Sequence, residues 1–527
     1  MRVGLRRADR LYCLSLWLGL LGPLGRNNYA CDDLWGKLSI PALWLATGRF
    51  PYSDPFSYTA PGAPWIDHEW LSGVVFYAAL ALGGDPALSL LKAAMTALMI
   101  AGAFWMARLH RVSALWPAGF LLLGLPYFFI GFTATGRPQV FTFCLLPLLL
   151  ALLERTRLSG RFRLLWAVPL AGAFWANLHG GFVVGLAMVL CYAAGEALRG
   201  KAWTPYLLAA AAWAAASLIN PYGFGYWRYL AYALALPRAE ITEWRAVLVW
   251  GLEHWPLKLS AMAAGAAVLL AALRCRDERW PWRELPWPHV LALAACVWQA
   301  FRAAKLAPLG ILSAAVLVPP LLAWARPGRL DEPEAGRPVL PVFCLAGALL
   351  WALGNWWCMR PRLQPWHVQV RDSGYPQRYR QSAMVYPVGA VRFLEGSGGG
   401  GNVLTPFDVG EFVYWRLYPR FRVSIDGRLE CVYPMDAFRR QVEAVHNGRL
   451  DDPAVRSADW VLTRRSPMLY EALKASPLWR TEHEDGEFVL FRRASVPAPA
   501  RDVRAEGAPG GWSPTSAFFR GSERFRG

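Results

Sequence analysis

Two short polar clusters lie within an otherwise apolar N-terminal region. The first is the carboxylate pair Asp32 and Asp33, and the second is the run Asp67-His68-Glu69. Carboxylates can take a proton from an attacking hydroxyl group, and with imidazole they can also hold a divalent cation. The 27–67 segment is rich in Trp and Pro and has turn signals, so we expect an ordered loop that brings the clusters close together.

The two clusters predict different roles. Asp33 is the first candidate for a general base and Asp32 the second, although one of them could simply cap a helix that begins DLWGKL. Asp67, His68 and Glu69 are the right types for a metal site or a network near a phosphate. However, consecutive residues at the start of a helix point in different directions, and acidic residues there are favoured by the helix dipole alone. Both interpretations of each cluster stay open.

Four further residues are candidates for a phosphate site. The motif GRPQ contains Arg137, and FRAAK contains Arg302 and Lys305; each could bind a phosphate or extend toward lipid headgroups. His179, in WANLHGG, precedes two glycines that would let a substrate approach the backbone closely. The alternative for His179 is a hydrogen-bonded structural histidine.

The elements that must position these residues are apolar helices. Of the 527 residues, 55% are hydrophobic, and apolar runs near membrane-spanning length recur through the first 357 residues. Many of the 28 Trp residues lie at the ends of these runs, as in an interfacial aromatic belt. The candidate spans are 9–26, 68–83, 86–107, 113–132, 138–153, 163–178, 181–197, 204–219, 257–274, 286–301, 305–325 and 339–357. The sequence therefore predicts an α-helical polytopic membrane protein with about 11 to 13 spans.

Charge predicts the orientation of these spans. The net charge is +18, and most Lys and Arg flank the apolar runs, which indicates positive-inside anchoring rather than nucleic-acid binding. The basic connectors then lie in the cytoplasm, while the 27–67 loop, the candidate cations and everything after residue 358 lie outside. If successive spans simply alternate in direction from the N-terminus, the orientation of the front half disagrees with that of the later half by one crossing. A split or re-entrant element within 86–137 would remove this disagreement.

The C-terminal part has a different character. Strand-like and helix-like segments alternate from about residue 385, which predicts a small extracytoplasmic α/β domain. A tail rich in Pro, Gly, Ser and Arg follows and is expected to be disordered. The predicted organisation is a first helix (1–26), an acidic loop (27–67), a multi-pass domain (68–357), a linker (358–384), the α/β domain (385–493) and the tail (494–527).

Several motifs carry a family resemblance. DDLWGKL, TGRFPYSDPFSYT, PWIDHEWL, GRPQVFT, WANLHGGF and INPYG, with TPFDVGEFVYWRL and FRVSIDGR near the C-terminus, resemble a mostly uncharacterised bacterial branch of the GT-C superfamily of membrane glycosyltransferases. The resemblance covers most of the chain. It implies inverting transfer of a sugar from a polyprenyl-phosphate-linked donor to a lipid, glycan or protein acceptor at the outer face of the cytoplasmic membrane. Asp33 would then activate the acceptor, Arg137, Arg302, Lys305 and His179 would surround the donor phosphate, and Mg²⁺ or Mn²⁺ is a possible cofactor.

Two other kinds of protein are weighed against a transferase. A transporter should show internal repeats and binding residues at mid-depth, whereas the polar residues here gather at one predicted face and no repeat is evident. A non-catalytic protein of envelope-polysaccharide assembly would use the α/β domain to bind a partner. Soluble enzymes of the common motif classes are excluded, since GxSxG, Walker and HExxH motifs are missing from the sequence.

Overall fold

The chain is described here by a computed structural model. It divides into two compact units. The helical unit comprises Met1–Asn27, Leu90–Ala134 and Pro138–Pro365, and the mixed unit comprises Asn28–Ser89, Thr135–Arg137 and Trp366–Gly527. The residues that the structure describes are 13–14, 16–21, 29–125, 127–128, 134–238, 241–277, 282–325, 368, 370, 385–465 and 468–494.

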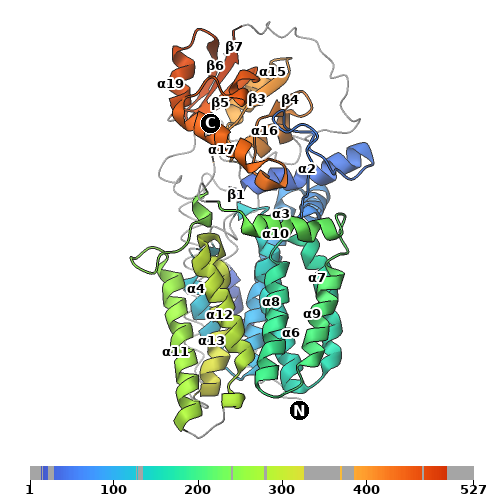
Figure 1. Cartoon of the computed structure of the whole chain (residues 1–527), viewed down its shortest axis with the longest axis vertical. Helices are drawn as coiled ribbons and strands as arrows, with labels where there is room; N and C mark the ends of the chain where they lie inside the picture. Colours follow the sequence, from blue (N-terminus) through green and yellow to red (C-terminus); the bar gives the residue numbers. More distant parts are fainter. Residues whose placement is uncertain are drawn as a thin grey trace. The chain divides into compact units, whose positions relative to one another are not determined.

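The helical unit is a bundle of apolar helices that run side by side, with α10 lying across one end of them (Figure 1). Within it α13 packs against α4, α11 and α12, and α8 packs against α9 and α12. Its helices, besides the second part of α3, are α4 (Leu115–Leu123), α6 (Gln139–Ser159), α7 (Ala167–Leu178), α8 (Phe182–Leu198), α9 (Thr204–Ala216), α10 (Phe224–Ala235), α11 (Trp255–Asp277), α12 (Trp287–Arg302) and α13 (Ala307–Ala325). Short 3₁₀ turns are η1 (Phe162–Trp166), η2 (Thr242–Trp244), η3 (Trp282–Glu284) and η4 (Ala304–Leu306).

Helices lie at the positions of the predicted spans between residues 138 and 325, to within a few residues. In the described part of the chain, four helices are long and apolar enough to cross a membrane: Trp70–Leu109, Gln139–Ser159, Trp255–Arg276 and Ala304–Ala325. α13 is buried around almost its whole circumference, as expected for a helix without a polar face at the centre of a bundle. The number of spans stays a prediction, because the 339–357 segment and most of 9–26 lie outside the described residues.

Helix α3 (Trp70–Leu109) contains the predicted break between the 68–83 and 86–107 spans. Its helical geometry is interrupted at Gly83 and Gly84, and Gly84 has a φ of 65°. Glycine adopts this left-handed conformation without the penalty that a Cβ would bring, and Pro86 then permits helix to resume in its first turn. The sequence GGDP therefore ends one helix and begins the next.

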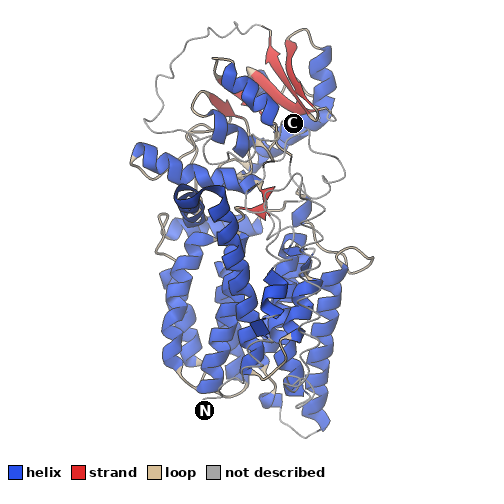
Figure 2. Ribbon diagram, turned by 180° about the vertical axis from the view of Figure 1, so that it is seen from behind, coloured by secondary structure: helices blue, strands red, loops and turns tan. Residues whose placement is uncertain are grey.

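The mixed unit contains strands as well as helices (Figure 2). A two-stranded sheet pairs β1 (Tyr29–Ala30) with β2 (Ala134–Thr135). The main sheet has the order β4-β3-β5-β7-β6, in which β4, β3 and β5 are parallel and β7 is antiparallel to its neighbours. Its strands are β3 (Gly401–Leu404), β4 (Phe421–Val423), β5 (Trp460–Arg464), β6 (Trp479–Asp485) and β7 (Phe488–Arg493). Its helices are α2 (Asp32–Thr47), the first part of α3, α15 (Val388–Gly396), α16 (Gly410–Leu417), the 3₁₀ turn η6 (Leu429–Cys431), α17 (Met435–Asn447), α18 (Pro453–Arg456) and α19 (Met468–Ala475).

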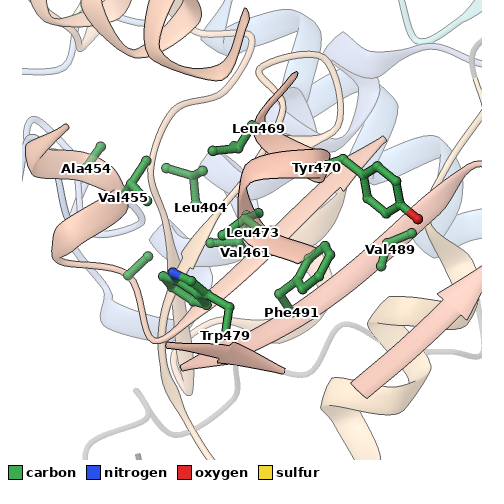
Figure 3. Packing of buried hydrophobic residues seen from close by; sticks show 11 residues of the cluster. Leu404, Ala454, Val455, Val461, Leu469, Tyr470, Leu473, Trp479, Val489 and Phe491 are labelled. Carbon is green, nitrogen blue, oxygen red and sulfur yellow. The ribbon is translucent and has the colours of Figure 1, made fainter. Parts of the chain in front are cut away.

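The core of the α/β domain lies between α18, α19 and one face of the sheet. Leu469 and Leu473 of α19 pack with Val461, Val489 and neighbouring apolar side chains, as Figure 3 shows. Each predicted strand and helix between residues 401 and 493 is present, including the hairpin whose turn contains Asp485-Gly486. The chain is therefore a polytopic helical membrane protein with a C-terminal α/β domain. The domain boundaries and the extracytoplasmic location of this domain stay predictions.

The 48–69 segment joins the α/β domain of the mixed unit. Ser57 forms a parallel bridge with Val423, the last residue of the edge strand β4, and Tyr58 N–H donates to the Val423 carbonyl over 2.9 Å. The ring of Phe56 stacks on Tyr414 of α16 with centroids 4.2 Å apart. The predicted loop is thus ordered, and it extends the edge of the C-terminal sheet.

Candidate functional site

Asp32 and Asp33 form the first turn of α2. The helix begins at Asp32 after Cys31, whose side chain makes no capping hydrogen bond, so neither aspartate occupies the capping position. Acidic groups in the first helical turn interact favourably with the helix dipole and with backbone N–H groups that have no partner within the helix. The side chains of Asp32 and Asp33 are 23% and 27% exposed, so they can meet a substrate.

Arg137 lies beside this acidic turn. Its Nε atom is 3.3 Å from Asp33 Oδ2, and its Nη2 atom is 4.0 Å from Asp32 Oδ1. Gly136 makes this approach possible, since it has a φ of 93° and a Cβ at this position would overlap the side chain of Leu34. Two predicted site elements far apart in sequence, the aspartates and GRPQ, are therefore in direct contact.

Glu411 is a residue of this site that the sequence analysis did not identify. It lies in α16, and its Oε2 accepts a hydrogen bond over 2.9 Å from the backbone N–H of Gly36, one turn after Asp32. Gly36 is required here, because a Cβ would lie 2.6 Å from Cδ of Glu411. The fully buried Trp35 fixes the same junction, with ring centroids 5.8 Å from Tyr386 and 5.2 Å from Phe412. The available signal was an acid within the aromatic run GEFVYWRL.

Burial and like charge act on two ionisable groups next to the aspartates. Burial and the nearby carboxylates of Asp426 and Asp33 raise the pKa of Glu411 well above its ordinary value. Burial and the carboxylates of Asp33 and Asp32 likewise raise the pKa of the Cys31 thiol. Both shifts favour the protonated, neutral form of these groups beside the aspartate pair.

The second predicted cluster is neutralised from within the mixed unit. Lys37 Nζ lies 2.8 Å from Asp67 Oδ1 and 3.1 Å from Glu69 Oε2. Burial acts to lower the pKa of Lys37, but the two carboxylates outweigh it and raise that pKa well above its ordinary value. Asp67 Oδ1 also accepts a hydrogen bond from the backbone N–H of Glu69, just before α3. His68 Nε2 lies 3.5 Å from Glu69 Oε1, and His68 Nδ1 lies 3.9 Å from Cys431 Sγ. Asp67 and Glu69, through Lys37, thus join α2 to the start of α3.

A buried arginine holds the loop against the α/β domain. Arg428 donates to Asp54 over 2.7 Å and to Asp426 over 2.6 Å, and Tyr433 donates to Asp426 over 2.6 Å. The side chains of Arg428, Asp54 and Asp426 are at most 4% exposed. The motif DGR at 426–428 and the DPF segment of the loop at 54–56 therefore belong to one ion-pair network.

The other predicted cations belong to the helical unit. Lys305 Nζ lies 3.1 Å from Glu243 and 4.9 Å from the centroid of the Trp244 ring. Arg302, the last residue of α12, lies over Trp298 at 5.4 Å from the ring centroid. Both side chains are held by neighbours of their own unit, and their predicted part in phosphate binding stays a prediction.

His179 is hydrogen-bonded at the end of α7. Its Nδ1 lies 2.7 Å from Thr142 Oγ1 and accepts the N–H of Gly181 over 3.0 Å. Trp175 Nε1 donates to the same Thr142 oxygen over 2.8 Å, so the hydroxyl proton of Thr142 points to His179. Nδ1 is then an acceptor, and the proton of the neutral imidazole lies on Nε2. The predicted space beside Gly181 is filled by the Thr142 and His179 side chains.

The acidic turn has ligands for a hard divalent cation. Cys31, Asp32 and Asp33 place one ligand atom each within 4.8 Å of one another. Mg²⁺ and Mn²⁺ prefer oxygen, and Mg²⁺ is often held by one or two carboxylates together with substrate phosphates. The two aspartates suit this role, whereas the protonated thiol of Cys31 does not.

Comparison with known proteins identifies the fold. The sequence matches no family model and no curated protein. The structure is similar to the archaeal oligosaccharyltransferase AglB from Archaeoglobus fulgidus, solved with an inhibitory peptide and a dolichol-phosphate, with a TM-score of 0.54 and 12% identity over 87% of this chain and 70% of that chain. The chain has the fold of the GT-C glycosyltransferases.

A second GT-C structure supports the same assignment. The arabinofuranosyltransferase AftD from Mycobacteria aligns with 94% of this chain at a TM-score of 0.50 and 14% identity. This chain spans 40% of the length of AftD, so the similarity covers less than half of a much longer protein. The predicted resemblance is therefore confirmed for the fold.

Proposed function

We propose that this chain is a glycosyltransferase that moves a sugar from a polyprenyl-phosphate-linked donor to an acceptor hydroxyl or amide at the outer face of the cytoplasmic membrane. The observation that carries the proposal is the contact of Asp33 with Arg137 at the exposed N-terminus of α2. This arrangement places a candidate base, Asp33, in contact with a cation, Arg137. The GT-C fold gives this pairing its functional context, since AglB and AftD are glycosyltransferases by name.

The chemistry needs one base and one site for the leaving group. Asp33 accepts the proton of the acceptor nucleophile while the nucleophile attacks the anomeric carbon. The bond from that carbon to the phosphate oxygen breaks on the opposite side, so the anomeric configuration inverts and polyprenyl phosphate leaves. Arg137 stabilises the negative charge that develops on the phosphate. A divalent cation held by Asp32 and Asp33 would add positive charge at the same place.

A transporter for lipid-linked sugars is the second candidate, favoured only by the multi-pass helical unit. The two activities differ in whether the sugar–phosphate bond breaks. The purified protein in proteoliposomes would be given undecaprenyl-phosphate monosaccharides in turn, with envelope lipid and glycan extracts as acceptors. Release of undecaprenyl phosphate, detected by mass spectrometry and dependent on acceptor, supports a transferase. Movement of intact donor across the bilayer without release would overturn the proposal.

A further inference from the structure

Three ligand-type side chains of the helical unit meet at a point separate from the acidic turn of α2. His110 directly follows α3, Glu154 lies in α6, and His289 lies in the first turn of α12. His110 Nε2 is 2.8 Å from Glu154 Oε1, and His289 Nε2 is 2.9 Å from Glu154 Oε2. One atom from each side chain lies within 4.8 Å of the others. The three side chains come from three different elements, so sequence spacing gives no sign of them.

The cluster is buried and its carboxylate is held firmly. The side chains of Glu154 and His289 are 0% and 1% exposed, while that of His110 is 15% exposed. Arg157 donates to Glu154 Oε2 over 2.9 Å, and Tyr192 donates to the same oxygen over 3.1 Å. Such outer hydrogen bonds orient a carboxylate that coordinates a metal and balance its charge. Arg157 Nη2 also donates to Glu154 Oε1 over 2.5 Å, so a metal ion would bind the remaining lone pair of Oε1.

His289 shows an unusual geometry. Its Nε2 lies 2.9 Å from Glu154 Oε2 as an ion-pair contact outside hydrogen-bond geometry, and in the described residues its Nδ1 has no hydrogen-bond partner. A buried ring nitrogen without a hydrogen bond is costly. Two atoms that bind the same ion lie close together without pointing at each other, because each directs its lone pair at the ion. His289 Nε2 and Glu154 Oε2 show this arrangement, since they are 2.9 Å apart and do not form a hydrogen bond.

We propose that His110, Glu154 and His289 form a binding site for a zinc ion. Two imidazoles and one carboxylate are a ligand set that zinc accepts, at about 2.0–2.2 Å for each bond, with a fourth position left for water. Ligand atoms of a tetrahedral site are then roughly 3.3 Å apart. His110 Nε2 lies 2.8 Å from Glu154 Oε1, a few tenths of an ångström closer, and one ligand atom of each residue lies within 4.8 Å of the others, so small ring rotations would admit the ion. The partly exposed edge of His110 provides its entry path.

The ion would fasten the end of α3 to α6 and to the start of α12. This role is structural, and it is independent of the proposed glycosyl transfer. A ligand that binds the folded chain and not the unfolded chain raises the unfolding temperature. Zinc should therefore stabilise the protein without altering the acidic turn of α2.

The test measures metal in the full-length protein, purified in detergent without chelator. We expect about one zinc per chain by mass spectrometry of the metal, removal by phenanthroline with a fall in unfolding temperature, and restoration of both by added zinc. Cobalt added to the stripped protein should give visible absorption bands typical of tetrahedral coordination. Protein that neither carries zinc nor takes up zinc or cobalt would overturn the proposal.

Three variants locate the site. His110→Ala, at the partly exposed ligand, should reduce zinc to background while the chain stays folded. The double variant Asp32→Asn, Asp33→Asn should keep its zinc, as should His446→Ala at an exposed imidazole of α17. Zinc retained by His110→Ala, or lost from the aspartate double variant, would contradict the assignment to this cluster.

Discussion

At the residue scale, the raised pKa of Glu411 affects the charge around the acidic turn of α2. A neutral carboxyl group can accept the Gly36 N–H without adding a third negative charge next to Asp32 and Asp33. An ionised Glu411 would repel both. The α/β domain thus supports the proposed site through a buried group that does not itself touch the substrate.

This protonation predicts a pH dependence of stability. Between the ordinary carboxyl pKa of 4.5 and the raised pKa of Glu411, the folded chain keeps a proton that the unfolded chain releases. Stability from this group is therefore present at low pH and lost as pH rises through that window. Glu411→Gln, which keeps an oxygen acceptor and cannot ionise, should lose less stability with rising pH than the wild type.

The measurement is the thermal unfolding midpoint of both proteins from pH 4.5 upward. Glu395→Gln provides the matched control, since Glu395 is a partly exposed partner of Arg416. Its profile should run parallel to that of the wild type. If the Glu411→Gln profile also ran parallel to the wild type, Glu411 would not titrate as inferred.

At the element scale, a proline and a glycine set the angle between α2 and α3. Pro41 has no N–H to offer the carbonyl of Lys37 four residues earlier. Gly73 of α3 packs onto that carbonyl, and a Cβ on Gly73 would overlap the Lys37 oxygen. The same helices are joined by Lys37 with Asp67, so the backbone contact and the ion pair act together.

Replacement of Gly73 by Ala should therefore destabilise the protein and weaken turnover. The new Cβ would overlap the backbone oxygen of Lys37, which cannot move aside as a flexible side chain can, so α2 and α3 would have to move apart. Gly265→Ala in α11 is the control, since nothing lies within 4 Å of a Cβ there. In that helix interior alanine should be neutral or stabilising by up to about 1 kcal/mol. Equal unfolding temperatures for the two variants would contradict this account of the helix contact.

At the scale of the whole molecule, an N-terminal segment folds as part of a C-terminal domain. The edge bridge at Ser57 and the buried pair of Asp54 with Arg428 join residues more than 350 positions apart in sequence. The acidic loop therefore depends on the α/β domain for its shape. This explains why a long polar loop is ordered directly after the first apolar segment.

Removal of Arg428 should test this dependence. Arg428→Gln would leave Asp54 and Asp426 buried without their cation, which costs about 3–5 kcal/mol. Arg449→Gln is the matched control, because Arg449 and Asp451 are both largely exposed and solvent screens their attraction. Thermal unfolding of both variants in detergent checks the difference. Similar losses for the two would show that the network does not hold the loop.

The sequence predicted elements far better than contacts. Apolar length and turn residues placed all but one of the α-helices described between 138 and 325 and the strands after 401, because these signals are local. The helix at 224–235 was missed, since FGYWRYLAYALA is short and carries an arginine. Glu411, Arg428 with Asp54, and the His110–Glu154–His289 cluster could not be predicted, because each joins segments whose pairing only the fold determines.

The central claim is that Asp33 removes the proton from the acceptor. Asp33→Asn keeps a side chain that suits a helix start and removes the base, whereas Asp451→Asn removes an exposed carboxylate elsewhere in the mixed unit. The decisive measurement is the turnover number of both variants for release of undecaprenyl phosphate, at matched folding and expression. We predict a loss of at least about 100-fold for Asp33→Asn, within the range for removal of a general base, and wild-type turnover for Asp451→Asn. Wild-type turnover by Asp33→Asn would contradict the account.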